Sequence, residues 1–203
     1  PRRRVERAER AVRLRRLQQS RGRGGVGPAE DPASERREAQ ADERDVFDSI
    51  NDIHAFFQTF APEFNYANSS INGYVSRNDG YCPGNAWWDG SINFCRESGS
   101  FANTGEIQGV VHHEYGHGIS NRLVGGPSNV SCLGNTQQAG EGLSDWWALA
   151  YTAKPGDTGP QGRGIGTYAL NQPTTGVGIR QQRYSTDPAI NTWTYQSISG
   201  AAV

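Results

Sequence analysis

The stretch VVHHEYGHGISNRL, residues 110–123, contains three of the four histidines of this 203-residue chain. His113 and His117 are four positions apart, so on a helix they lie one turn above each other with Glu114 beside them. Two imidazoles in this arrangement can bind one tetrahedral cation at about 2.0–2.1 Å. The spacing is that of the H-E-x-x-H motif, in which the glutamate is the general base of zinc-dependent hydrolysis. Taken alone, such a pair can also belong to a solvated helix face.

A third ligand is available in AGEGLSDWWALAY, residues 139–151, where Glu141 and Asp145 are again four positions apart. Glu141 completes a His₂Glu set with an open fourth position, the arrangement of catalytic zinc. Asp145 is placed to accept the free N–H of a ligating imidazole, that of His113, and to fix its tautomer. The combined pattern, H-E-x-x-H, then 23 residues, then E-x-x-x-D, is far more specific than either half. Zn²⁺ is therefore the expected cofactor.

Two helices must position these groups. Asn103 can cap the first, with Glu106 as its capping-box partner, and glycines at 125 and 126 end it. The second is expected from about residue 138 to 151. His112 is adjacent to His113 and so points about 100° away from it, which predicts a packing role.

The segments before these helices have weaker signals. DVFDSINDIHAFFQTFA, residues 45–61, predicts a helix with an apolar face that includes His54, which we interpret as a structural histidine. Residues 71–95 are typical of short strands broken by glycine and asparagine. Cys82 and Cys95 flank an Asp-Gly hairpin signal, so they are expected to pair across adjacent strands, leaving Cys132 over. Three buried free thiols are the alternative.

Composition limits the classes of function. The net charge is −1, the mean hydropathy is −0.72, and no apolar run is long enough to cross a bilayer, so no membrane insertion is expected. Residues 1–44 are charge-dense and are predicted to be a disordered linker, a pro-segment remnant or a non-native end. They have no aromatic side chain to stack on bases, so no nucleic-acid partner is expected. The chain has no methionine, which indicates a fragment or a processed form.

The run HEYGHGISNRLVGGPSNVSCL, followed by EGLSDWW, resembles the fungalysin-type (M36-like) zinc metallopeptidases within the gluzincin group. The resemblance is strong over residues 51–147, weaker through GIRQQRYSTDPAINTWTY, and absent from residues 1–44. It implies an α+β, zincin-like domain with a zinc-binding helix pair and a mixed or antiparallel sheet with an exposed edge strand. Residues 45–203 would then be an incomplete catalytic domain of a secreted, extracellular enzyme that acts on proteins or peptides. A monomer is expected, although the sequence does not determine the oligomeric state.

Carried over to this sequence, the resemblance implies that His113, His117 and Glu141 bind zinc and that Glu114 is the catalytic base. The expected reaction is endopeptidase hydrolysis by metal-activated water. A zinc aminopeptidase is a second interpretation, but no acidic anchor for a free amine is evident. A third is a truncated or degenerate domain that binds zinc and peptides without turnover.

The resemblance also suggests substrate contacts. Asn85 and Ala86 in NAWWDG match an edge strand that pairs with the substrate backbone, although a tight hairpin with packed tryptophans has equal weight. Arg180 in GIRQQRYSTDP resembles an arginine aimed at the substrate carbonyl, and Arg183 competes for that role.

Two features depart from the family pattern. The spacing between the second histidine and Glu141 is slightly shorter than in the fungal enzymes. No histidine follows His117, so the late residue that stabilises the oxyanion is expected to lie beyond Val203, with Tyr184 and Tyr195 as possible substitutes.

Overall fold

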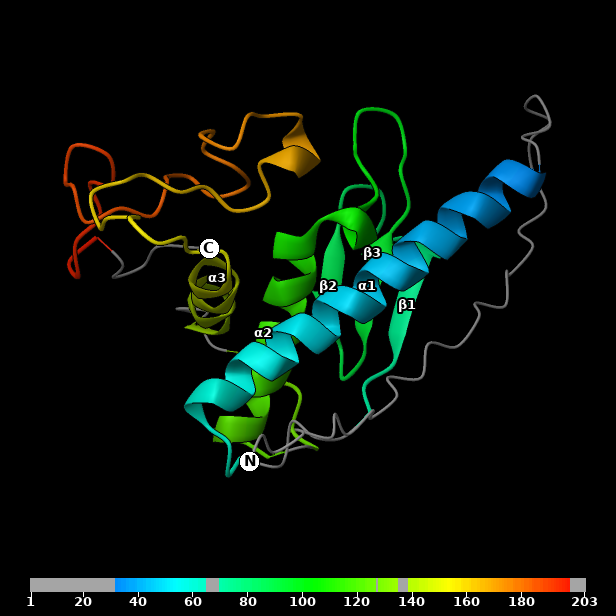
Figure 1. Ribbon diagram of the computed structural model, residues 1–203, viewed down its shortest axis with the longest axis horizontal. Helices are drawn as coiled ribbons and strands as arrows, with labels where there is room; N and C mark the ends of the chain where they lie inside the picture. Colours follow the sequence, from blue (N-terminus) through cyan, green and yellow to red (C-terminus); the bar gives the residue numbers. More distant parts are fainter. Residues whose placement is uncertain (1–31, 65–69, 127, 135–138, 198–203) are drawn as a thin grey trace, which may run out of the picture.

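A computed structural model describes residues 32–64, 70–126, 128–134 and 139–197, with the backbone alone described for 32–40. The elements, in chain order, are α1 (Pro32–Phe60), β1 (Gly73–Arg77), β2 (Ala86–Trp88), β3 (Ile92–Cys95), η2 (Thr104–Glu106), α2 (Gln108–Val124), α3 (Ala139–Tyr151) and η3 (Tyr168–Leu170). The long helices and the small sheet confirm the α+β expectation (Figure 1). No helix in the described part of the chain has the length and apolar character that a bilayer crossing requires.

The sheet is mixed, and β2 forms one of its edges. The strand order is β1-β3-β2, with β1 parallel and β2 antiparallel to β3. Trp87 of β2 is opposite Asn93 of β3, and the Asp89–Gly90 turn joins the two strands, with Gly90 at a φ of 98°. This is the exposed edge strand that the sequence predicted.

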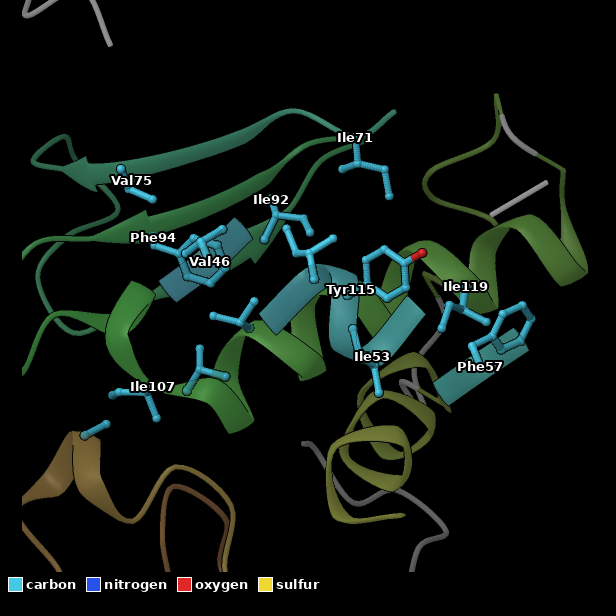
Figure 2. Close-up of a cluster of buried hydrophobic side chains, with 14 residues drawn as sticks. Val46, Ile53, Phe57, Ile71, Val75, Ile92, Phe94, Ile107, Tyr115 and Ile119 are labelled. Carbon is cyan, nitrogen blue, oxygen red and sulfur yellow. The ribbon is translucent and has the colours of Figure 1, made fainter. Parts of the chain in front are cut away.

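The hydrophobic core lies between α1, α2 and the sheet (Figure 2). Three of the four side chains that α2 contributes to the core recur every four residues and are almost completely buried: Val111, Tyr115 and Ile119. Each large apolar side chain buried in this way contributes about 1.5–3 kcal/mol. Because one face of α2 is held in the core, its opposite face, which carries His113 and His117, is presented to α3.

The first helix corrects the predicted boundary between residues 44 and 45. α1 begins at Pro32, so that boundary falls inside a helix. Asp42 is completely buried and accepts hydrogen bonds from Ser76 Oγ and Asn103 Nδ2. The charged stretch is rich in alanine, glutamate and arginine, which favour helix, so charge density alone was a misleading sign of disorder. Residues 1–31 lie outside the described residues, and their predicted disorder stays a prediction.

The disulfide and the two structural histidines are confirmed. Cys82 and Cys95 are bonded, and Cys132 is free. His54 Nδ1 is 2.7 Å from the hydroxyl of Tyr115. His112 is completely buried, with its ring centroid 4.4 Å from that of Tyr151, and burial lowers its pKa to about 4.

Candidate metal centre

The helices α2 and α3 approach closely because Gly116 has no side chain. A Cβ atom at this position would lie 2.9 Å from the Cα of Ser144 on α3. Non-bonded carbon atoms normally stay about 3.5–4.0 Å apart, so only glycine permits this contact. This close approach places His113 and His117 of α2 next to Glu141 of α3.

Two imidazole nitrogens and both oxygens of one carboxylate meet at this contact. His113 Nε2 is 3.1 Å from His117 Nε2 and 3.2 Å from Glu141 Oε2, and His117 Nε2 is 3.3 Å from Glu141 Oε1. A tetrahedral ion with bonds of about 2.0–2.1 Å holds its ligand atoms about 3.3 Å apart. With one ligand atom taken from each side chain, all three atoms lie within 4.8 Å of one another, so the side chains are near the separation that one such ion requires. They form the one group in the described residues that could hold a metal.

Asp145 orients the first imidazole. Its Oδ1 is 2.6 Å from His113 Nδ1, and the carboxylate is completely buried. When His113 loses one proton to bind a metal, the remaining proton is therefore assigned to Nδ1, and the Nε2 lone pair then faces His117 and Glu141. The sequence prediction for Asp145 agrees with this geometry.

The ionisable groups of the cluster perturb each other strongly. Burial by itself lowers the pKa of His113, but hydrogen bonds to Asp145 and Glu141 outweigh it and raise this pKa to about 10. Burial raises the pKa of Glu141, yet the hydrogen bonds to His113 and His117 hold that pKa far below its usual range. For Asp145, burial is again outweighed by its hydrogen bonds, and its pKa is about 2. The carboxylates are thus anionic, and a metal ion must displace a proton from His113.

Glu114 differs from Glu141 and Asp145 because one of its carboxylate oxygens is buried without a hydrogen-bond partner. Its side chain is buried, and its Oε2 has no hydrogen-bond partner among the described residues. Burial raises its pKa, although the neighbouring His113 and His117 oppose this. A buried carboxylate with a raised pKa beside a metal site is a candidate proton acceptor.

A cavity of about 710 Å³ surrounds these groups. The cavity is lined by the three candidate ligands and Glu114. Other residues that line it include Asn85, Ala86, Val130, Ser131, Leu133, Gly134, Ile179 and Arg180. The sequence-predicted substrate residues therefore lie around the same cavity as the candidate ligands. Arg183 does not line it, and its Nη1 donates to the carbonyl of Thr175.

The free edge of β2 faces this cavity with a defined hydrogen-bonding pattern. Cys95 N donates to the carbonyl of Asn85, so Asn85 faces β3. In an antiparallel pair the next residue points its N–H and C=O the other way, which directs those of Ala86 away from β3. Trp88 Nε1 donates to Asn121 Oδ1 at 2.7 Å and fixes the edge strand to α2. The N–H of Ala86 donates to the Asn85 side chain at 3.0 Å, so an extended peptide can pair with β2 at Ala86 when it displaces that bond.

Arg180 and Tyr184 contact the carboxylates of α3. Arg180 Nη2 donates to Glu141 Oε2 at 2.9 Å, and its Nε donates to Asp145 Oδ2 at 2.7 Å. The hydroxyl of Tyr184 also donates to Asp145 Oδ2, at 2.6 Å. The Tyr184 hydroxyl is therefore bound to Asp145, and Tyr184 is not among the residues that line the cavity. This does not favour its use in place of the oxyanion residue. Tyr195, the other suggested substitute, is 93% exposed and does not line the cavity.

The sequence interpretation missed two contributors. Gly116 lies inside the H-E-x-x-H motif, but the sequence analysis did not interpret it. A glycine between two candidate ligands can indicate that another helix packs closely at that position. Tyr184 was considered only as an oxyanion donor, because no local pattern links it to Asp145.

Comparisons with known proteins agree with this geometry. The model of the fungalysin metallopeptidase family (M36) matches residues 87–203, more than half of the chain. The chain is similar to extracellular metalloproteinase 4 of Trichophyton soudanense, with 46% identity over 94 residues that cover 45% of this chain and 23% of that protein. Extracellular metalloproteinase 4 of Trichophyton rubrum (46% identical) and extracellular metalloproteinase 2 of Arthroderma otae (44% identical) match over the same length, 14% of each protein. The match thus spans less than a quarter of each of these relatives.

Proposed function

Since this chain belongs to the fungalysin metallopeptidase family, we propose that it carries the zinc site of a secreted endopeptidase. Membership of a family of metallopeptidases implies a metal cofactor and protein or peptide substrates. The proposed zinc ligands are His113, His117 and Glu141, and the proposed general base is Glu114. The relatives are named extracellular, and the disulfide between Cys82 and Cys95 is typical of an oxidising compartment, which supports secretion.

The observation that carries the proposal is the meeting of two imidazole nitrogens and one carboxylate within 3.1–3.3 Å of each other. Nitrogen and carboxylate donors in a His₂Glu set are typical of catalytic zinc. The unpartnered Oε2 of Glu114 beside this set gives the site a group that can accept a proton.

Each of the cavity residues has a separate role in the proposed reaction. A bound zinc ion supplies Lewis acidity, which lowers the pKa of water and polarises a carbonyl group. Ala86 holds the substrate backbone as an added strand, with Asn85 beside it. Glu114 takes a proton from the attacking water and delivers it to the leaving amine. Arg180 binds the carbonyl oxygen near the cleaved bond and stabilises the charge that develops there.

The test combines zinc analysis with a peptide-cleavage assay on the chain and on Glu114→Gln. The variant should bind one zinc ion as the unchanged chain does, and its cleavage rate should fall by about 10²–10⁴-fold because the base is lost. Glu97→Gln, at an exposed glutamate, is the matched control and should keep full activity. Activity retained in Glu114→Gln would defeat the assignment of the base.

A second outcome would favour a different function. Stoichiometric zinc with no hydrolysis of any peptide by the unchanged chain would support a zinc- and peptide-binding domain without turnover. Absence of stoichiometric zinc would contradict both proposals.

A further inference from the structure

Asp145 receives four hydrogen bonds although it is completely buried. His113 Nδ1 and Arg180 Nη2 bind Oδ1, at 2.6 and 3.0 Å. Arg180 Nε and the hydroxyl of Tyr184 bind Oδ2, at 2.7 and 2.6 Å. Arg180 therefore supplies two of the four donors, and each oxygen also has one donor that does not come from Arg180.

Arg180 has other partners besides Asp145. It also donates to Glu141 Oε2 at 2.9 Å, and it lines the cavity in which a substrate carbonyl would lie. An arginine that turns towards a substrate releases some of its bonds to Asp145. Without Tyr184, Oδ2 would then have no donor, and a buried carboxylate oxygen without a donor is strongly unfavourable.

The position of Tyr184 is fixed independently of Arg180. Its backbone pairs in both directions with that of Arg163, at N···O distances of 2.9 and 3.0 Å. The Arg163 side chain in turn donates to the carbonyl of Leu149 at 2.7 Å and to Thr152 Oγ1 at 2.6 Å, at the end of α3. The phenol is thus anchored to the helix that carries Asp145.

We propose that Tyr184 is a positioning residue, whose hydroxyl holds the Asp145 carboxylate, and through it the His113 ring, in place while Arg180 is engaged elsewhere. Tyr184 is not one of the candidate ligands and does not line the cavity around them. Its effect reaches the metal through the bond between Asp145 and His113, which sets the direction of the Nε2 lone pair. The part of this inference that concerns metal affinity rests on the proposed zinc site.

The test measures zinc affinity by chelator competition in Tyr184→Phe, which keeps the ring and removes only the hydroxyl. Partners of this kind typically change metal affinity by 10–100-fold. We expect a loss of about threefold where Arg180 still supports Asp145, and of about tenfold or more in an Arg180→Ala background. The Co²⁺ absorption spectrum should change in the same order. Tyr168→Phe, at a tyrosine that is 62% exposed, is the control and should match the unchanged chain.

The dependence on Arg180 distinguishes positioning from a general structural role. A purely structural tyrosine would cost the same factor in both backgrounds, and that result would overturn the inference. Zinc affinity unaffected by Tyr184→Phe in both backgrounds would overturn it too.

A metal-free measurement separates this inference from the proposed function. In the zinc-free chain, the His113 Nδ1 proton that is bound to Asp145 should exchange slowly with water in NMR spectra. Tyr184→Phe should speed that exchange several-fold, and more in the Arg180→Ala background. Failure of the unchanged chain to bind zinc would defeat the proposed function alone, whereas unaltered proton exchange in Tyr184→Phe would defeat the positioning role.

Discussion

Replacing Gly116 with alanine should push apart the two helices that form the metal centre. The added Cβ would lie 2.9 Å from Ser144 Cα and 3.2 Å from Ser144 Cβ. The shortest contact is to backbone, which cannot rotate away, so α3 must move by about 0.6–1 Å to restore an ordinary carbon–carbon distance. Glu141 is three residues before Ser144 on the same helix and moves with it.

The expected magnitudes follow from this geometry. Overpacking of this size costs about 1–3 kcal/mol, while alanine gains about 0.5–1 kcal/mol over glycine inside a helix. The free energy of unfolding should therefore fall by about 0–2.5 kcal/mol. Metal–ligand distances tolerate only about ±0.2 Å, so a shift of this size at Glu141 should weaken zinc binding at least about tenfold.

Two other glycines provide matched controls. Gly109 on α2 and Gly142 on α3 would place a Cβ atom with no other heavy atom within 4 Å. Alanine at either position should raise the free energy of unfolding by about 0.5–1 kcal/mol and leave zinc affinity unchanged. The assays are urea unfolding of the metal-free chain and chelator competition for zinc. If Gly116→Ala bound zinc within about twofold of Gly109→Ala, the argument from helix contact would be wrong.

Two more predictions concern the disulfide and the proton on His113. The bridge between Cys82 and Cys95 closes a loop with a sequence separation of 13, so replacing both by serine should cost about 3 kcal/mol in urea unfolding; a loss near zero would show that the loop is held by other contacts. The pKa of about 10 for His113 means that, in the metal-free chain, its favourable interactions are fully present below the usual pKa of 6.5 and are lost as pH rises through 10. Zinc must displace that proton, so zinc affinity should rise by up to about tenfold per pH unit between pH 6.5 and 8.5; an affinity that is flat above pH 7.5 would contradict this.

The ligands could be predicted from sequence because their arrangement is set locally. A helix places residues four apart on one face whatever surrounds it, so the pairs His113–His117 and Glu141–Asp145 were readable from spacing. The order of the two helices is also local, since a capping residue and terminal glycines mark the first one. Even here the detail differs: the side chain of Asn103 accepts from Gly105 N and caps η2, and α2 itself begins at Gln108.

The support of the ligands could not be predicted in the same way. Tyr184 and Asp145 are 39 residues apart, and the chain between them contains few periodic signals. Their contact depends on the backbone pairing of Tyr184 with Arg163, and no residue type in either segment predicts that pairing. The start of α1 was missed for the opposite reason. A strong local signal, charge density, was given more weight than helix propensity and than the buried partners of Asp42, which come from distant segments.

The two faces of α2 explain why the site can exist before any metal binds. One face, with Val111, Tyr115 and Ile119, is fixed in the core, so the direction of the other face does not depend on a ligand. The other face carries His113, whose charge and that of Arg180 are neutralised by Glu141 and Asp145 of α3 at 2.6–3.2 Å. Removing any one partner from such a buried cluster leaves an uncompensated charge, which usually costs more than the pair contributed. The cluster therefore holds the ligands near their binding positions before zinc binds. The same ion pairs keep a proton on His113 that zinc must displace, so the affinity for zinc and its dependence on pH have the same physical origin.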